Sequence, residues 1–231
     1  QKGKIREEQA KTIFHRFHFL EKKLDLLKDC SLVIEAIVEK TDVKQALFAH
    51  LAALNGQHTI LASNTSSLSL TEIAADVDHK ERVCGLHFFN PAPLMKLVEV
   101  IRGYHTSDET VRTVMEMSRK MGKEPVEVKK DTPGFIVNRL MIPHFLEAIK
   151  MYEEGIATIE DIDKAVKLGL NYPMGPFELM DLTGVDIGLH VADYLYRELN
   201  KESKWSAPTL MRSMVRAGKL GRKTGGGWYK Y

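Results

Sequence analysis

The sequence lacks the features of several specialised protein classes. Its 231 residues include only two cysteines, Cys30 and Cys84, which are too few for a disulfide framework and fit a reducing compartment. No apolar run approaches the ~18 residues that cross a bilayer. Thirty-three Lys and Arg against 31 Asp and Glu give a net charge of +2, so the overall field favours neither a nucleic acid nor an anionic membrane. An anionic ligand therefore has to be held by a local site.

Two sequence signals of ligand binding are also absent. A complete dinucleotide-binding fold has Gly-x-Gly-x-x-Gly between a strand and a helix, and this motif does not occur in the sequence. The three glycines at 225–227 precede Trp228 with no helical pattern after them, so we expect a tight turn and a short terminal strand there. The histidines show no metal-ligand spacing with cysteines or carboxylates, and we predict no metal site.

Up to about residue 128, strand-length apolar runs alternate with segments of helical period. This pattern is typical of a parallel sheet layered with helices. Strands are predicted at 31–38, 59–63, 83–89, 97–101 and 125–128. Between the first two, Val43, Leu47, Leu51 and Leu54 form one apolar stripe, which predicts a helix over 42–54.

Local signals mark further helix starts in this half. Ser69-x-x-Glu72 and Thr106-x-x-Glu109 are capping-box patterns, in which a hydroxyl and a carboxylate satisfy the free amides of a first helical turn. The first thirty residues carry an excess of positive charge, and they predict a charged surface helix that leads into a strand near 14–20.

After Asp131-Thr132-Pro133-Gly134 the strand-like runs give way to helical ones. Helices are predicted at 135–154, 158–168 with Gly169 as its cap, 175–182, 185–199 and 207–217. We therefore expect an α/β protein in which a sheet domain over 1–128 is followed by an all-helical domain over 129–231.

The strongest local signal is His87, which lies near the end of the predicted strand 83–89. Ligands of open α/β sheets bind at strand ends. Glu99 places a carboxylate inside the predicted strand 97–101, where an unpaired acid is uncommon. If the two strands are neighbours, Glu99 can orient one ring nitrogen of His87 and leave the other free to take a proton. A structural ion pair and a surface Glu on an edge strand remain alternatives.

Two further polar segments flank this predicted site. Ser63-Asn64-Thr65-Ser66-Ser67 puts hydroxyls and an amide at the end of another strand, on the rim that carries His87. An ordinary helix-entry loop has the same composition. Asn138 lies in the first turn or so of the helix predicted from residue 135, where it can point into an interdomain cleft. A solvated helix start explains that pattern equally well.

Five ordered motifs extend over the chain from about residue 30. They are Leu32-Val33-Ile34-Glu35-Ala36-Ile37-Val38-Glu39, Ser63-Asn64-Thr65-Ser66-Ser67, His87-Phe88-Phe89-Asn90-Pro91, Asp131-Thr132-Pro133-Gly134-Phe135-Ile136-Val137-Asn138-Arg139 and Tyr172-Pro173-Met174-Gly175-Pro176-Phe177-Glu178. In this order and spacing the chain resembles the NAD-dependent 3-hydroxyacyl-CoA dehydrogenases, and most of all their 3-hydroxybutyryl-CoA members. The resemblance implies a Rossmann-type NAD-binding domain, incomplete at its N-terminus, followed by an all-helical substrate and dimerisation domain.

The resemblance also implies roles for particular residues. His87 would be the general base that takes the proton from the 3-hydroxyl of an acyl-CoA thioester, with Glu99 as its orienting partner. Ser66 and Asn138 would bind the substrate oxygens. The residues that contact NAD near its nicotinamide ribose would be Glu39, Lys44, Ser66, Asn90 and, from the helical domain, Lys223. Members of the family form homodimers through the helical domain.

The resemblance does not extend to the glycine-rich βαβ unit with which the family begins. We therefore expect an N-terminally truncated chain with impaired cofactor binding, and a micromolar NAD affinity in calorimetric titration would contradict this. One alternative is a non-catalytic dimeric structural or self-association module related to the dehydrogenases. Another is a dehydrogenase of free hydroxy acids or sugar acids. The thiol content fits the cytoplasm and also the mitochondrial matrix.

Overall fold

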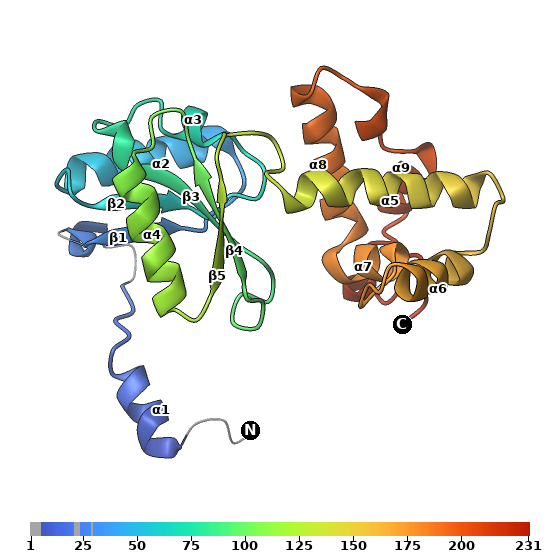
Figure 1. Ribbon diagram of the computed structural model, residues 1–231, viewed down its shortest axis with the longest axis horizontal. Coiled ribbons are helices and arrows are strands. Elements are labelled where there is room, and N and C mark those ends of the chain that lie inside the picture. Colours follow the sequence, from blue (N-terminus) through green and yellow to red (C-terminus); the bar gives the residue numbers. More distant parts are fainter. Residues whose placement is uncertain (1–5, 21–23, 29) are drawn as a thin grey trace.

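The computed structural model describes residues 6–20, 24–28 and 30–231, and within them a sheet of five strands is followed by a helical unit (Figure 1). The strands are β1 (Leu32–Glu35), β2 (Ile60–Ser63), β3 (Val83–Phe88), β4 (Leu97–Arg102) and β5 (Glu124–Val128). They lie in sequence order across the sheet. β1, β2 and β3 are parallel, β4 is antiparallel to β3, and β5 is parallel to β4. The carboxyl ends of β1 to β3 therefore share one edge with the amino ends of β4 and β5.

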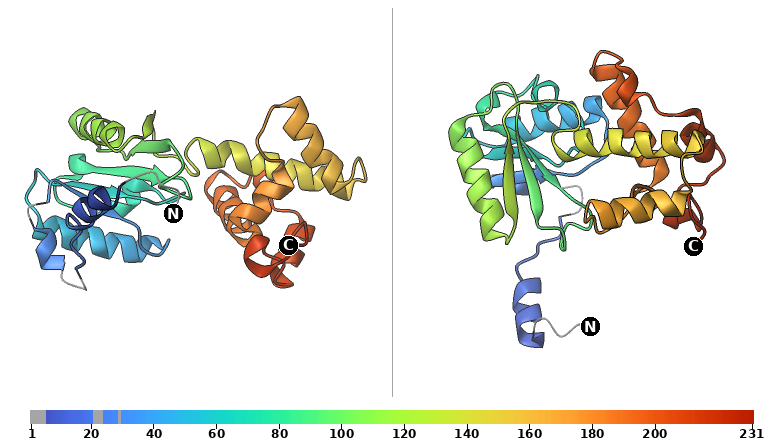
Figure 2. Two further views of the ribbon diagram at one scale, coloured as in Figure 1. Left: turned by 90° about the horizontal axis from the view of Figure 1, so that it is seen from below. Right: turned by 45° about the vertical axis from the view of Figure 1, so that its right-hand side comes forward.

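Helices cover both faces of this sheet. The helices of this half are α1 (Glu7–Phe14), α2 (Thr41–Leu54), α3 (Leu70–Ile73) and α4 (Asp108–Lys120), with short 3-10 turns η1 (Leu24–Leu27) and η2 (Lys80–Arg82). Of these, α1 has no buried residue and lies away from the sheet (Figure 1). Figure 2 shows α2 on one face and α4 on the other. Each face has its own apolar core, one with Phe48 and Leu51 of α2 and the other with Val111 and Val114 of α4. The predicted α/β architecture is confirmed.

Four local predictions in this half need correction. The prediction of a strand near 14–20 is wrong, because α1 ends at Phe14 and residues 15–20 pair with no strand. The predicted exposed helix before it is present as α1. α2 is rotated about its axis relative to the predicted stripe, so that Lys44 is buried and Val43 is exposed. The cap of α4 is Ser107, whose hydroxyl accepts from the Thr110 amide. β1 ends at Glu35, three residues before the end predicted at residue 38. The chain turns there, because the Glu35 carboxylate accepts a hydrogen bond from the Ile37 amide.

The helical unit has its own core. Its helices are α5 (Val137–Glu153), α6 (Ile159–Gly169), α7 (Pro176–Thr183), α8 (Val185–Glu198) and α9 (Thr209–Arg216), with 3-10 turns η3 (Ser203–Trp205) and η4 (Arg222–Thr224). Gly169 lies inside α6 and is not its cap; Leu170 caps the helix, and Asn171 after it takes a left-handed φ of 56°. None of the described helices combines the length and low charge that a membrane span requires.

The sheet and the helical unit are packed against each other at the start of α5 and on α8. Phe135 and Tyr194 are buried in the apolar cluster that α2 forms against the sheet. Burial raises the pKa of Tyr194 to about 12. In addition, the Asp131 carboxylate accepts from the Ser69 hydroxyl at 2.6 Å and from the Thr71 amide at 2.7 Å. The predicted division between residues 128 and 129 stays a prediction, although the sheet ends at Val128 and α5 begins nine residues on.

A buried carboxylate holds the end of the chain. The oxygens of Asp181 on α7 accept from the amides of Trp228 at 3.0 Å and Tyr229 at 2.9 Å, and from the Tyr231 hydroxyl at 3.2 Å. The glycine turn is present, with Gly225 at a φ of 72°. The predicted terminal strand is reduced to isolated bridges, because Asp181 takes amides that a strand ladder would use.

We expect Asp181→Asn to lower the free energy of unfolding by about 1–3 kcal/mol, since a neutral amide offers one acceptor oxygen where three donors converge on a buried carboxylate. Urea denaturation followed by tryptophan fluorescence measures the change. The control is Asp76→Asn, an exposed position after α3, which should change stability by less than about 0.5 kcal/mol. Equal losses from the two variants would contradict the anchoring role.

Candidate active site

His87 and Glu99 are directly opposite each other on the antiparallel strands β3 and β4. The His87 Nδ1 lies 2.7 Å from Glu99 Oε2, and the side chains are only 7% and 1% exposed. Since a carboxylate can only accept, the ring donates its Nδ1 proton, which leaves Nε2 as the nitrogen open to a substrate. The predicted contact between these two residues is present. Whether they act as a catalytic pair stays a prediction.

The second oxygen of Glu99 holds the helical unit. Glu99 Oε1 accepts from the backbone amides of Ile136 and Val137, each at 3.0 Å, and these amides begin α5. The first amides of a helix have no partner within the helix, and they favour a negative charge. One buried carboxylate therefore orients the histidine and also caps the helix that leads into the second unit.

Aromatic rings enclose the histidine. The ring of Phe89 lies 4.5 Å from the His87 ring and that of Phe135 lies 5.7 Å from it, measured between centroids. Phe135 takes a φ of 50°, a conformation that bulky residues rarely adopt. The chain accepts this strained backbone at the turn where α5 meets the edge of the sheet. The apolar rings keep water from one side of the imidazole.

The structure brings Ser66 and Asn138 together, as the prediction of a shared site requires. The Asn138 Nδ2 donates to the Ser66 carbonyl at 3.1 Å. Asn138 is the second residue of α5, and Ser66 lies in the loop after β2. Their contact joins the two units at the edge of the sheet where His87 lies.

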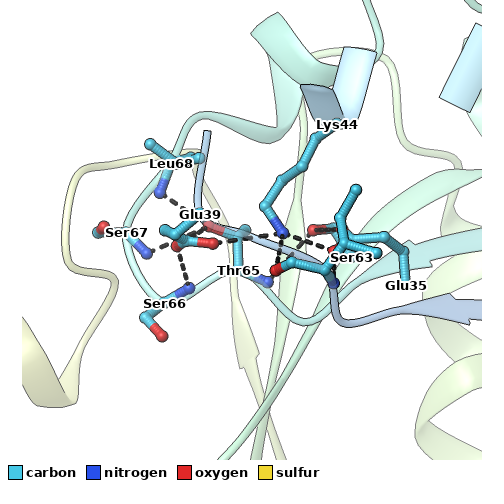
Figure 3. Close-up of polar contacts among 9 residues, drawn as sticks. Glu35, Glu39, Lys44, Ser63, Thr65, Ser66, Ser67 and Leu68 are labelled. Carbon is cyan, nitrogen blue, oxygen red and sulfur yellow. Dashed lines mark hydrogen bonds and ion pairs between the residues drawn. The ribbon is translucent and has the colours of Figure 1, made fainter. Parts of the chain in front are cut away.

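Glu39 and Lys44 lie beside the same loop (Figure 3). Glu39 Oε1 accepts from the Thr65 hydroxyl at 2.6 Å and from the Ser66 amide at 2.8 Å. Its other oxygen is 3.3 Å from the Lys44 ammonium. The Glu39 side chain is 30% exposed, whereas that of Lys44 is 1% exposed. Of these two side chains, only that of Glu39 is partly exposed.

The two remaining predicted cofactor residues differ in position. Asn90 is exposed and lies two residues after the end of β3, the strand that carries His87. Lys223 forms an ion pair with Asp186 of its own unit at 2.6 Å. Among the described residues, no hydrogen bond or ion pair joins Lys223 to the sheet. The predicted cofactor role of Lys223 stays a prediction.

Sequence reasoning missed one residue of this region, Glu35. It is buried, and it accepts hydrogen bonds from Lys44, Ser63 and the Ile37 amide. The signal that singled out Glu99, an acid inside an apolar strand, is equally present in Leu32-Val33-Ile34-Glu35. In the part of the chain that the structure describes, no group of three or more His, Cys, Asp or Glu could hold a metal ion.

Comparison with known proteins agrees with this arrangement. The model of the 3-hydroxyacyl-CoA dehydrogenase NAD binding domain matches residues 1–132, and that of the 3-hydroxyacyl-CoA dehydrogenase C-terminal domain matches residues 134–231. A 3-hydroxybutyryl-CoA dehydrogenase of Clostridioides difficile is 50% identical over 89% of this chain and 72% of that protein. The mitochondrial hydroxyacyl-coenzyme A dehydrogenase of Homo sapiens is 50% identical over 87% of this chain, which spans 63% of that protein's length.

Solved structures show the same kinship. A crystal structure of (S)-3-hydroxybutyryl-CoA dehydrogenase from Ralstonia eutropha superimposes with a TM-score of 0.94 at 43% identity, covering 100% of this chain and 80% of the other. The fold and the matches thus define a Rossmann-type oxidoreductase with NAD as its cofactor. The chain belongs to the NAD-dependent 3-hydroxyacyl-CoA dehydrogenase family, and the predicted membership is confirmed.

The described residues fit one end of NAD. The partly exposed Glu39 carboxylate can accept from ribose hydroxyls, and Ser66 and Asn90 lie at the same sheet edge. Gly-x-Gly-x-x-Gly, which would hold the pyrophosphate at a helix start, does not occur in these 231 residues. The match between these residues and NAD is therefore limited to the nicotinamide ribose and does not include the pyrophosphate.

Glu99→Gln should lower the free energy of unfolding by about 1–3 kcal/mol. The amide has only one acceptor oxygen and no charge, so it cannot accept hydrogen bonds from both the His87 ring and the first amides of α5 as the carboxylate does. Chemical denaturation measures this loss. Glu116→Gln is the matched control, an exposed acid on α4, and should be nearly neutral. A Glu99→Gln variant of unchanged stability would show that the α5 contact contributes little.

Proposed function

We propose that His87 is the general base of a reaction that interconverts (S)-3-hydroxyacyl-CoA and 3-oxoacyl-CoA. The observation that carries the proposal is the 2.7 Å contact between buried His87 and Glu99. With Nδ1 held by Glu99, Nε2 accepts the proton of the 3-hydroxyl. The Glu99 carboxylate then stabilises the imidazolium that forms. A positioned base of this kind typically contributes about 10²- to 10⁴-fold to a rate.

Ser66 and Asn138 hold the reacting oxygen of the substrate. Asn138 has two amide protons and gives one to the Ser66 carbonyl, so the other remains for the substrate. The Ser66 hydroxyl is half-buried beside it. NAD supplies the hydride acceptor when it is bound. Glu39 and Asn90 contact its nicotinamide ribose, and Lys44 and Lys223 act in the same site.

Two features support the acyl-CoA reaction over the alternatives. The C. difficile and R. eutropha relatives are named for 3-hydroxybutyryl-CoA. A buried histidine is paired with an acid at the sheet edge where ligands of such folds bind. This arrangement is suited to proton transfer, and a purely structural module does not require it. The free thiols Cys30 and Cys84 support a reducing compartment, the cytoplasm or the mitochondrial matrix.

His87→Gln should lower kcat for NADH-dependent reduction of acetoacetyl-CoA by about 10²- to 10⁴-fold with little change in the substrate KM, because it removes the proton donor and acceptor. The complete gene product is assayed by the loss of NADH absorbance. His50→Gln, an exposed position on α2, serves as the control. Equal rates from the two variants would rule out His87 as the base. Equal activity on free acetoacetate would favour a hydroxy-acid dehydrogenase.

The partner that we propose for the helical unit is a second copy of the chain. Three apolar side chains stand exposed within five residues at the end of α6: Leu168, Leu170 and Tyr172. An exposed apolar cluster of this kind is typical of an interface. Light scattering should give twice the 26.2 kDa chain mass.

Leu168→Glu with Leu170→Glu should give monomers, because burying two carboxylates at an apolar contact is unfavourable. The control is Leu94→Glu, which changes an equally exposed leucine on the sheet unit. A dimer that persists in the double variant would place the interface elsewhere, and a monomeric parent chain would remove the proposal.

A further inference from the structure

A buried ion cluster lies behind the loop that carries Ser66 (Figure 3). The Lys44 ammonium is 2.6 Å from Glu35 Oε1 and 3.3 Å from Glu39 Oε2. Lys44 and Glu35 each have side chains only 1% exposed. The two acids come from the segment that ends β1 and the lysine from α2, so the cluster joins a strand, its following turn and a helix.

Lys44 links the two acids. Its ammonium donates to Glu35 Oε1 at 2.6 Å and to the Ile37 carbonyl at 3.5 Å, and it forms an ion pair with Glu39 Oε2 at 3.3 Å. Because its side chain is buried, Lys44 holds both carboxylates in fixed positions.

Glu35 connects the cluster to the loop at a second point. Its Oε2 accepts from the Ser63 hydroxyl at 2.7 Å, and the Ser63 oxygen in turn accepts from the Thr65 amide at 3.2 Å. Glu39 holds the next residues, through the Thr65 hydroxyl and the Ser66 amide. Ser63, Thr65 and Ser66 are thus held by two carboxylates that share one lysine.

From this loop the connection continues into the second unit. Ser66 receives a hydrogen bond from Glu39 at its amide, and its carbonyl accepts from Asn138 on α5. The position of Ser66 and the orientation of the Glu39 carboxylate therefore depend on the same cluster. These are the groups that the proposed function brings to the substrate oxygen and the cofactor ribose.

Stability alone does not explain a buried pair of this kind. Removing two charges from water costs about as much as their attraction returns, and apolar side chains of similar size often serve a core as well or better. The charged side chains can, however, fix the positions of neighbouring polar groups through hydrogen bonds, which apolar side chains cannot do.

We propose that Glu35 is a positioning residue for the nicotinamide end of the site, acting through Lys44 and Ser63 on Glu39 and the loop of residues 64–68. The proposal rests on the proposed function. The role predicted for Lys44 as a cofactor contact stays a prediction, and Glu35 orients this lysine as well as the loop.

The first test needs no ligand. In Glu35→Gln/Lys44→Met both charges are removed together, so no unpaired charge is left in the core. NMR-detected hydrogen exchange of the ligand-free chain should show the amides of Ser66 and Leu68 exchanging about tenfold faster, as one charge-assisted contact is lost. Glu35→Gln alone should lower Tm more than the double variant, because it leaves Lys44 with one carboxylate.

Ser63→Ala tests the same connection without touching a charge. It removes the acceptor of the Thr65 amide, whose exchange should rise. Ser118→Ala is its matched control, a fully buried serine on α4 whose hydroxyl bonds within its own helix. Arg102→Met/Glu127→Gln controls for the loss of an ion pair, since that pair joins β4 and β5 at the opposite end of the sheet. Neither control should alter exchange in residues 64–68.

The second test is kinetic and uses the complete gene product. Glu35→Gln and Ser63→Ala, which both keep Lys44, should each raise the KM for NADH about tenfold and leave kcat within about threefold, because His87 and Glu99 are unchanged. Wild-type exchange in the loop, or faster exchange with an unchanged KM for NADH, would overturn the proposal. Full activity of His87→Gln would contradict the proposed function. That outcome would not change the hydrogen-exchange result, so the two proposals can be judged separately.

Discussion

The arrangement of the site depends on the carboxylate of Glu99. It lies on the third residue of β4, and its two oxygens face different parts of the molecule, one the His87 ring and the other the first amides of α5. A buried charge is tolerated only where such donors surround it. Because the same group orients the proposed base and caps the helix that carries Asn138, the relative position of the two units and the geometry of the base are fixed together.

Carboxylates serve the same purpose at other points of the chain. Glu35 and Glu39 fix the loop after β2, and Asp181 holds the C-terminal segment with three donors. Asp163 accepts from the amides that begin α7 and from the Tyr229 hydroxyl, and burial raises the pKa of this acid. In each case a charged acceptor replaces the regular backbone pairing that is missing at an irregular segment.

The sequence was sufficient for the elements with strong periodicity, and its errors have identifiable causes. The strands and long helices were predicted because their apolar spacing reflects one buried face. The phase of α2 was wrong because a buried Lys44 does not count as apolar, although its pairing with two acids makes burial possible. The strand near 14–20 was predicted from apolar residues that have no strand partner in the fold. At α4, two adjacent hydroxyls could both cap, and Thr106 is occupied by the Val83 carbonyl.

By itself, the sequence determined the α/β class, the family and the identity of the chemically capable residues, because these follow from local periodicity and from motifs that are contiguous in the chain. Only the tertiary structure decided which of those residues meet. The His87–Glu99 pair depends on the antiparallel register of β3 with β4. The contacts of Glu35 with Lys44 and Ser63 and the ion pair of Lys223 with Asp186 join segments that are distant in the sequence. Such contacts are set by how helices and strands pack, and spacing along the chain does not encode them directly.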